Sequence, residues 1–191
     1  MLRFTSCLLA VALSLSAANA SPISTGIASH FDGDVPAETI ATFSIAACDT
    51  AAGIWGVAVA SKFFSVGSVV PWTRGDVGAV ATQSQGNTSF GPRGLDLLER
   101  GLTAEETMTV LLRKDADREH RQVGIVDANG GAATFTGKDC LVWAGGKTGP
   151  GYACQGNILT GPEVVDAMVK AFETTPGFLG DRMLAALEAG D

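Results

Sequence analysis

The first regular hydrophobic pattern in this sequence begins at Thr42. Residues 42–47 alternate apolar and small polar side chains, as a half-buried β-strand does. Residues 54–60 are almost continuously apolar, which is typical of a strand that is buried on both faces. Turn-forming residues at 49–53 separate the two segments, so the pattern predicts an antiparallel hairpin.

The central part of the chain predicts two short strands followed by two helices. The strands are expected at residues 66–70 and 77–82. The first helix, residues 92–100, has proline at its first position and glycine directly after its end. The second helix opens with a capping box, because Thr103 is followed three positions later by Glu106.

The last third of the chain repeats the order of strands and then helices. Four strands are expected there, at residues 121–127, 132–136, 139–143 and 152–159. Asn129-Gly130 lies between the first two of them and is a strong signal for a tight hairpin. Two amphipathic helices follow, at residues 162–173 and 178–188.

Strands and helices therefore occur in separate groups, which favours an α+β fold over alternating βαβ units. Two antiparallel sheets between layers of helices would explain why several strands are apolar on both faces. We expect the helices of residues 92–114 on one side of the sheets and those of residues 162–188 on the other.

The first 41 residues differ from the rest. Residues 1–20 have the parts of a secretory signal peptide, with Arg3, an uncharged apolar run and a final Ala18-Asn19-Ala20. Residues 21–41 are polar and are predicted to be a linker or pro-segment, which leaves residues 42–191 as one domain. We expect a periplasmic or secreted protein without stable membrane insertion, because the apolar run is too short to cross a bilayer.

Composition and charge narrow the function classes. The chain has 191 residues, 46% of them hydrophobic, and a net charge of −7, which argues against disorder and against nucleic-acid binding. It contains only two histidines and lacks clustered cysteines and phosphate-binding glycine motifs. The sequence therefore predicts neither a metal site nor a cofactor, and no Ser-His-Asp triad is recognisable.

Removal of the predicted signal peptide leaves three cysteines. Cys140 and Cys154 are each seven residues from Lys147, the middle of a glycine-rich run. If that run is a hairpin tip, the two cysteines face each other across the strands, and oxidation outside the cytoplasm favours a disulfide between them. Cys48 would then stay a buried free thiol.

Thr42 stands where the predicted domain begins. An N-terminal threonine carries a nucleophilic hydroxyl and a basic α-amine on one residue, so an enzyme that uses it needs no histidine. The alternative is that Thr42 is simply the first residue of a strand, where threonine is favoured. The spacing of residues alone favours this second interpretation.

Several segments of the chain resemble the DUF1028 family, whose uncharacterised members are assigned to the Ntn-hydrolase-like superfamily. The segments that carry the resemblance are Thr42-Phe43-Ser44-Ile45, Gly56-Val57-Ala58-Val59-Ala60-Ser61-Lys62-Phe63-Phe64, Val69-Val70-Pro71-Trp72, Gly78-Ala79-Val80-Ala81-Thr82-Gln83, Phe90-Gly91-Pro92-Arg93-Gly94-Leu95 and Gln155-Gly156-Asn157-Ile158-Leu159. The resemblance extends over residues 42–191 and implies a proteasome-type αββα sandwich.

This resemblance implies that Thr42 is a nucleophile, which requires a cut between Ala41 and Thr42 in addition to removal of the signal peptide. It also implies that the positive charge of Lys62 assists Thr42, although a solvated lysine at a strand end is an equal alternative. Gln83 and Ser84 lie where such folds offer a backbone N–H to the oxyanion.

Two further residues have candidate roles by the same resemblance. Asn157 would offer its side-chain amide to the oxyanion, or would be an ordinary strand-end asparagine. Arg93 would bind a substrate carboxylate, or would pair with Asp96 or Glu99 on its own helix.

The sequence thus predicts an exported Ntn-type hydrolase that cleaves a small amide or peptide bond. The alternative is a non-catalytic member of the same fold that binds a small ligand or a component of the cell envelope. Family members usually continue into closing strands after a segment like residues 184–191, so we expect a sheet without its last strands, or a fragment without its own function. The oligomeric state is left open.

Overall fold

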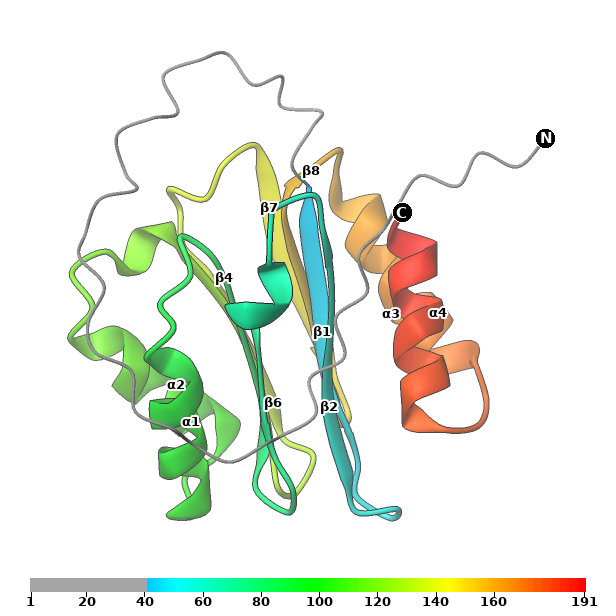
Figure 1. Cartoon of the computed structure of the whole chain (residues 1–191), viewed down its shortest axis with the longest axis horizontal. Coiled ribbons are helices and arrows are strands. Elements are labelled where there is room, and N and C mark those ends of the chain that lie inside the picture. Colours follow the sequence, from blue (N-terminus) through cyan, green and yellow to red (C-terminus); the bar gives the residue numbers. More distant parts are fainter. Residues whose placement is uncertain (1–40) are drawn as a thin grey trace.

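The structure is a computed structural model that describes residues 41–191. The predicted signal peptide and nearly all of the predicted linker lie outside these residues. The described chain forms two four-stranded antiparallel sheets with two helices on the outer face of each (Figure 1). The predicted α+β class, with two antiparallel sheets and two pairs of helices, is confirmed.

The first sheet has the strand order β2-β1-β8-β7. Its strands are β1 (Thr42–Asp49), β2 (Ile54–Ser61), β7 (Trp143–Gly149) and β8 (Tyr152–Leu159). The second sheet has the order β3-β4-β5-β6 and contains β3 (Pro71–Arg74), β4 (Gly78–Ser84), β5 (Arg121–Asp127) and β6 (Ala132–Thr136). Both sheets combine hairpin neighbours with strands that are distant in sequence, because β1 pairs with β8 and β4 pairs with β5.

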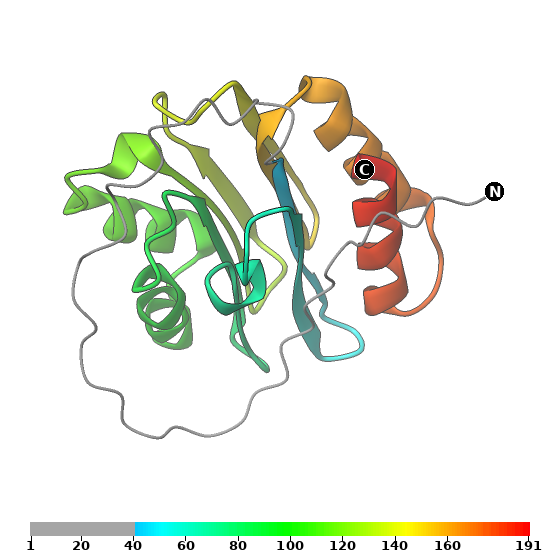
Figure 2. The same ribbon diagram turned by 45° about the horizontal axis from the view of Figure 1, so that its top comes forward.

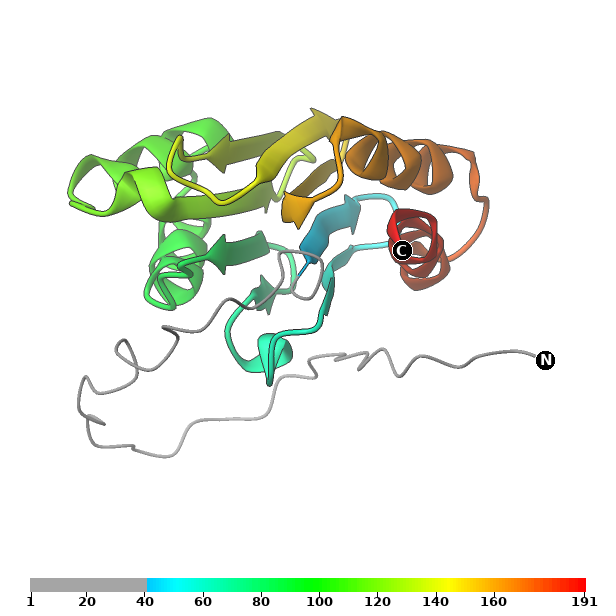
Figure 3. The ribbon, with the colours of Figure 1, turned by 90° about the horizontal axis from the view of Figure 1, so that it is seen from above.

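The four helices form the two outer layers, which Figure 3 shows from above. They are α1 (Phe90–Glu99), α2 (Ala104–Arg113), α3 (Pro162–Thr174) and α4 (Leu179–Gly190). Helices α1 and α2 pack against the second sheet, whereas α3 and α4 pack against the first. The predicted placement of the helix pairs on opposite sides is therefore correct.

The alternation of residues along β1 shows how the sequence builds these layers. Phe43, Ile45 and Ala47 point toward α3 and α4, whereas Ala46 and Cys48 point toward the second sheet. This two-residue period is a property of every strand, so each face of a central strand needs its own partner layer. A four-layer arrangement buries both faces.

Local signals explain several element boundaries. The Thr103–Glu106 capping box is present at the start of α2, with the Glu106 N–H donating to Thr103 Oγ1 at 3.2 Å. The turn between β5 and β6 places Gly130 at a φ of 81°, a conformation that glycine adopts without a steric penalty. Helix α1 begins at Phe90, two residues before the predicted start.

The strand predicted at residues 66–70 is wrong. Residues Val66–Ser68 form a short 3-10 helix, η2, which lies beside the strands in Figure 2. Val66 and Val70, four residues apart, are both buried between the sheets, so their apolar character reflects a helical turn rather than a strand. The segment after them forms β3, where Pro71 occupies the first position of an edge strand and needs no ladder N–H.

The predicted Cys140–Cys154 disulfide is not formed. The tip of the β7–β8 hairpin lies at residues 150–151, because Gly149 pairs with Tyr152, so Cys154 faces Lys147. Cys140 precedes β7, and its thiol contacts the Arg121 carbonyl oxygen at 3.5 Å. The three cysteines among the described residues are all free. The error arose because the glycine-rich run forms most of β7 instead of a long loop.

No helix among residues 41–191 is long and apolar enough to cross a membrane.

Candidate active site

The space between the two sheets is apolar at one end and polar at the other. We call the polar end the Thr42 end; β1, β5 and β7 begin there, and β2, β4, β6 and β8 end there (upper part of Figure 1). The inward-facing polar side chains gathered at this end are Thr42, Ser44, Ser61, Gln83, Gln122, Gln155 and Asn157. All are uncharged.

Thr42 lies on β1 between two neighbours that define its surroundings. It pairs with Ser61 of β2 on one side and with Asn157 of β8 on the other. Thr42 Oγ1 and Ser61 Oγ are 2.9 Å apart, and Ser61 Oγ also accepts a hydrogen bond from the Phe63 N–H at 2.9 Å. The Thr42 hydroxyl therefore has one defined hydrogen-bond partner, and the residue is only 8% exposed.

The register of β1 and β8 also fixes the direction in which the main-chain nitrogen of Thr42 points. The Cys48 N–H donates to the Gly151 carbonyl oxygen, and hydrogen-bonded pairs recur every second residue along an antiparallel ladder. Thr42 and Asn157 are six residues further along both strands, so they form a hydrogen-bonded pair. The nitrogen of Thr42 consequently points at the carbonyl oxygen of Asn157, and an amine at this position would keep that acceptor.

A continuous network of side-chain amides connects the two sheets behind Thr42. Gln155 Nε2 donates to Ser44 Oγ at 2.7 Å, and Ser44 Oγ donates to Gln83 Oε1 at 2.6 Å. Gln122 Oε1 accepts from both Gln83 Nε2 and Asn157 Nδ2, at 2.8 and 2.9 Å. The four amide side chains and Ser44 are at most 3% exposed, so the network is screened from water.

Gln122 sets the orientation of this network. Its Nε2 lies near three acceptors, Thr136 Oγ1 and the carbonyl oxygens of Gly145 and Gly156. Its Oε1 is therefore the acceptor for Asn157, and one N–H of Asn157 is already used. The other N–H of the Asn157 amide is left to interact at the Thr42 end.

Backbone strain is concentrated at the same end. Five non-glycine residues of the described chain have positive φ angles, and four of them, Ser65, Ser84, Val142 and Ile158, border the Thr42 end. Valine and isoleucine disfavour this conformation strongly because their side chains branch at Cβ. Such strain costs about 1–3 kcal/mol per residue and clusters at functional sites. Ile158 follows Asn157 directly, where the β7–β8 pairing is irregular.

Two of the candidate residues are not brought to Thr42. Lys62 follows Ser61 but is exposed, and it makes no hydrogen bond or ion pair with the described residues. Arg93 is exposed in the first turn of α1, and its side chain forms no hydrogen bond or ion pair with the described residues. The alternative pairing of Arg93 with Asp96 or Glu99 is also absent, because both carboxylates pair with Arg74.

The two candidate oxyanion donors of β4 differ from each other. The Gln85 N–H donates to the His120 carbonyl oxygen, so by the same two-residue period Gln83 and Gln122 form a hydrogen-bonded pair. The Gln83 N–H is thus used within the sheet. The Ser84 N–H points to the opposite side, beyond the start of β3, with Ser84 itself at a φ of 59°.

Four residues belong to the site but were not recognised in the sequence: Ser44, Ser61, Gln122 and Gln155. Polar residues two apart, such as Thr42 with Ser44 and Gln155 with Asn157, were a usable signal, since they mark a polar stripe on an otherwise buried strand face. Cys48 and Cys154 contribute no nucleophile: burial raises the pKa of Cys48 to about 11 and that of Cys154 to about 12, so both thiols stay protonated at neutral pH.

A half-buried ion pair fixes the loop between β4 and α1 near this end. Arg121, at the start of β5, donates to Asp115 at 2.9 Å and also contacts the Gln85 carbonyl oxygen. Asp115 additionally accepts from Asn87 Nδ2 at 3.4 Å. The side chains of Arg121 and Asp115 are 13% and 8% exposed, so the pair connects three segments and is partly shielded from water.

This ion pair predicts a specific acid sensitivity. The Arg121 hydrogen bonds hold the pKa of Asp115 below its usual value, so the stabilisation is complete at neutral pH and is lost as pH falls through the folded-state pKa. Asp115→Asn should cost about 2 kcal/mol at pH 7 and less in acid, once the pH falls below the ordinary aspartate pKa of about 3.9, as measured by urea unfolding. Asp117→Asn is the matched control, because Asp117 is 67% exposed and should change stability little. An equal loss at both pH values in Asp115→Asn would contradict this assignment.

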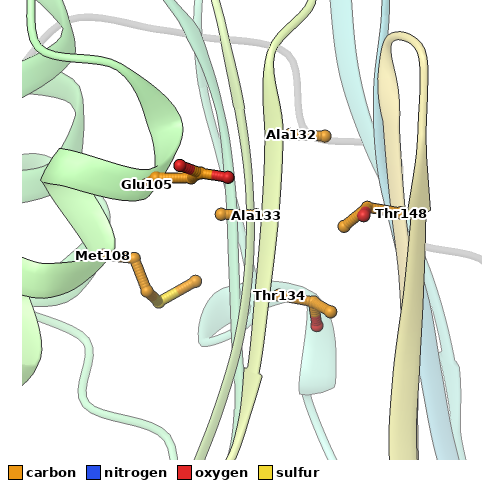
Figure 4. Close-up of a pocket in the computed structure, with 6 residues that line it drawn as sticks. All are labelled: Glu105, Met108, Ala132, Ala133, Thr134 and Thr148. Atoms are coloured by element: carbon orange, nitrogen blue, oxygen red, sulfur yellow. The ribbon is translucent and has the colours of Figure 1, made fainter.

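Two open hollows of about 300 Å³ each lie away from Thr42. One, between α2 and the edge strands β6 and β7, is lined by Glu105, Met108, Ala132, Ala133, Thr134 and Thr148 (Figure 4). The other lies at the hairpin tips of the opposite end, between Cys48 and Arg182. Neither contains a paired nucleophile and base. Within residues 41–191, no cluster of three His, Cys, Asp or Glu is placed to hold a metal ion.

Comparisons with known proteins give a family but no activity. A family model described as "Family of unknown function (DUF1028)" matches residues 42–191. The crystal structure of a protein from Silicibacter pomeroyi, assigned to the same family model, is similar to this chain with a TM-score of 0.76 and 32% sequence identity. The similarity covers 78% of this chain and 67% of that chain. No curated protein matches the chain.

Proposed function

Because the chain belongs to the DUF1028 family, for which no function is known, we propose its activity from the site itself: an exported Ntn-type hydrolase that cleaves an amide or peptide bond. Thr42 is the nucleophile in this proposal, after cleavage of the Ala41–Thr42 bond. The observation that carries the proposal is the position of Thr42, whose hydroxyl is paired with Ser61 at 2.9 Å and whose nitrogen faces the Asn157 carbonyl oxygen.

The fold supports this proposal. The Ntn-hydrolase architecture is an αββα sandwich, and two antiparallel sheets with helices on both outer faces agree with it. The uncharged polar stripe between the sheets supports it further, because a buried network whose amides are all hydrogen-bonded holds its side chains in one geometry, as a catalytic site requires.

The reaction requires only groups of this chain. The free α-amine of Thr42 accepts the proton of the Thr42 hydroxyl, and Oγ1 attacks the substrate carbonyl carbon. The remaining N–H of Asn157 and the Ser84 N–H are the candidate donors to the oxyanion. Collapse of the tetrahedral intermediate breaks the amide C–N bond, and the amine returns the proton to the leaving nitrogen. Water then hydrolyses the ester on Oγ1 and regenerates the enzyme.

While the Ala41–Thr42 peptide is intact, the nitrogen of Thr42 is an amide and cannot act as a base. The uncleaved chain is therefore expected to be an inactive precursor. A non-catalytic binding protein of the same fold is the alternative, and permanent retention of the Ala41–Thr42 bond would favour it.

A β-lactone probe tests the proposed nucleophile. Such a strained ester opens on an activated hydroxyl and adds its whole mass to it. We expect one lactone per chain in the exported protein, located by peptide mass spectrometry on a peptide that begins at Thr42. Thr136 is an internal control, because its hydroxyl is bound within the network and has no amine beside it. Labelling elsewhere, or none on a chain beginning at Thr42, would reject the mechanism.

A further inference from the structure

Two exposed apolar pairs stand on either side of Thr42 at the ends of the outer strands of the first sheet. Phe63 and Phe64 follow β2, and their side chains are 55% and 90% exposed. Leu141 and Val142 precede β7 and are 66% and 64% exposed. We call these four residues the apolar rim. They account for most of the large exposed apolar side chains among the described residues, the others being Phe178 and Leu184.

Both pairs are connected to the site by hydrogen bonds. The Phe63 N–H donates to Ser61 Oγ, the partner of the Thr42 hydroxyl. The Ile158 N–H donates to the Leu141 carbonyl oxygen at 3.2 Å, and Ile158 follows Asn157. Both pairs are also strained: Ser65, which follows Phe64, has a φ of 56°, and Val142 of the second pair has one of 53°. The structure therefore holds the rim in place at a cost in free energy, which ordinary surface loops do not require.

The dimensions of the rim identify the class of molecule that covers it. The pairs lie at the two edges of a four-stranded sheet, and three strand spacings make about 14 Å. An extended peptide covers this distance with about four residues, at roughly 3.3–3.6 Å each. The rim offers about 500 Å² of apolar surface, since an aromatic side chain presents roughly 150–250 Å². A stable dimer normally buries about 800 Å² on each partner, so a second copy is a poorer match.

We infer that the apolar rim is a substrate-binding surface for an extended, uncharged peptide with apolar side chains on both sides of the cleaved bond. This inference rests on the proposed function and specifies its substrate class. The central part of such a peptide crosses Thr42, while one apolar side chain contacts Phe63 and Phe64 and another contacts Leu141 and Val142. The inner face of the site supports this specificity, because it offers amides and hydroxyls but no charged group.

The test measures binding without requiring hydrolysis. A fluorescein-labelled Leu-Phe-Ala-Leu tetrapeptide amide and a polar Ser-Gln-Ala-Ser analogue are titrated by fluorescence anisotropy with the wild-type and Thr42→Ala proteins. We expect the apolar peptide to bind at least about 10-fold more tightly than the polar one, which corresponds to burial of about one apolar side chain. Phe64→Ser and Leu141→Ser should each weaken its binding about 10-fold. Phe178→Ser is the matched control, because Phe178 is 60% exposed at the start of α4, away from the rim.

Each outcome decides the inference. Equal affinity for the two peptides, no binding of either, or unchanged affinity in Phe64→Ser would overturn it. So would sedimentation velocity showing a dimer that Phe64→Ser dissociates, or rim-dependent binding to phosphatidylcholine vesicles, since these assign the rim to another occupant. Rim-dependent peptide binding without any turnover would reject the hydrolase and leave the binding surface standing. Equal turnover of apolar and polar peptides would support the hydrolase and reject the apolar rim as the surface that selects its substrate.

Discussion

Replacement of Thr42 by alanine is expected to abolish amide hydrolysis while the domain stays folded. The hydroxyl is the only proposed nucleophile, and loss of a nucleophile reduces kcat by several orders of magnitude. The loss of stability is small, because the Thr42 side chain makes a single hydrogen bond, with the Ser61 hydroxyl, and this bond contributes about 1 kcal/mol. Turnover of a fluorogenic peptide amide and thermal unfolding, followed on the same samples, separate the two effects.

Two further variants sharpen this prediction. Thr42→Ser keeps the hydroxyl and the amine and should retain measurable turnover. Lys62→Met removes an exposed charge that forms no hydrogen bond or ion pair with the described residues, so it should reduce turnover less than Thr42→Ala does. Thr42→Ala protein with wild-type turnover would show that another group performs the chemistry.

Replacement of Gln122 by leucine is expected to produce the largest loss of stability among single substitutions at the site. Gln122 Oε1 is the shared acceptor for Gln83 and Asn157, and its Nε2 donates to the Gly156 carbonyl oxygen at 2.7 Å. Leucine would leave these buried groups unpaired, at about 1–3 kcal/mol each, for a total of about 4 kcal/mol. That is a large part of the 5–15 kcal/mol typical of a domain.

Gln85→Leu is the matched control for this substitution. Gln85 lies on the exposed loop after β4, and only its main chain forms hydrogen bonds with described residues. Its replacement should change the free energy of unfolding by less than about 0.5 kcal/mol. Similar urea midpoints for the two variants would mean that the amide network does not stabilise the fold.

Periodicity along the chain was sufficient to predict the layers. The strand pattern of β1 and the capping box of α2 are both present in the structure. The expected burial of β2 on both faces is wrong: β2 is an edge strand and most of its residues are only partly buried, whereas β1 beside it is buried on both faces. The grouping of strands and helices then left few topologies, because each buried strand face needs a partner layer.

Register and long-range contact could not be predicted in this way. The cysteine pairing failed because the hairpin tip lies three residues beyond Lys147, and glycine-rich strands carry weak register information. Ser61 lies beside Thr42 through the antiparallel pairing of β1 and β2. Gln122 contacts Asn157 only because the second sheet packs on the first. The strain at Val142 and Ile158 has no sequence signal, since these residue types normally avoid positive φ.

The N-terminal residue of the mature, exported protein is the most direct test of the central claim that Thr42 is an N-terminal nucleophile. Intact-mass measurement, combined with N-terminal sequencing of the protein recovered from the culture medium or periplasm, identifies this residue without knowledge of the substrate. We expect a chain that begins at Thr42, produced by cleavage after Ala41. A mature chain that begins at Ser21 and keeps the Ala41–Thr42 bond would contradict it, because the nitrogen of Thr42 would then have no basic lone pair.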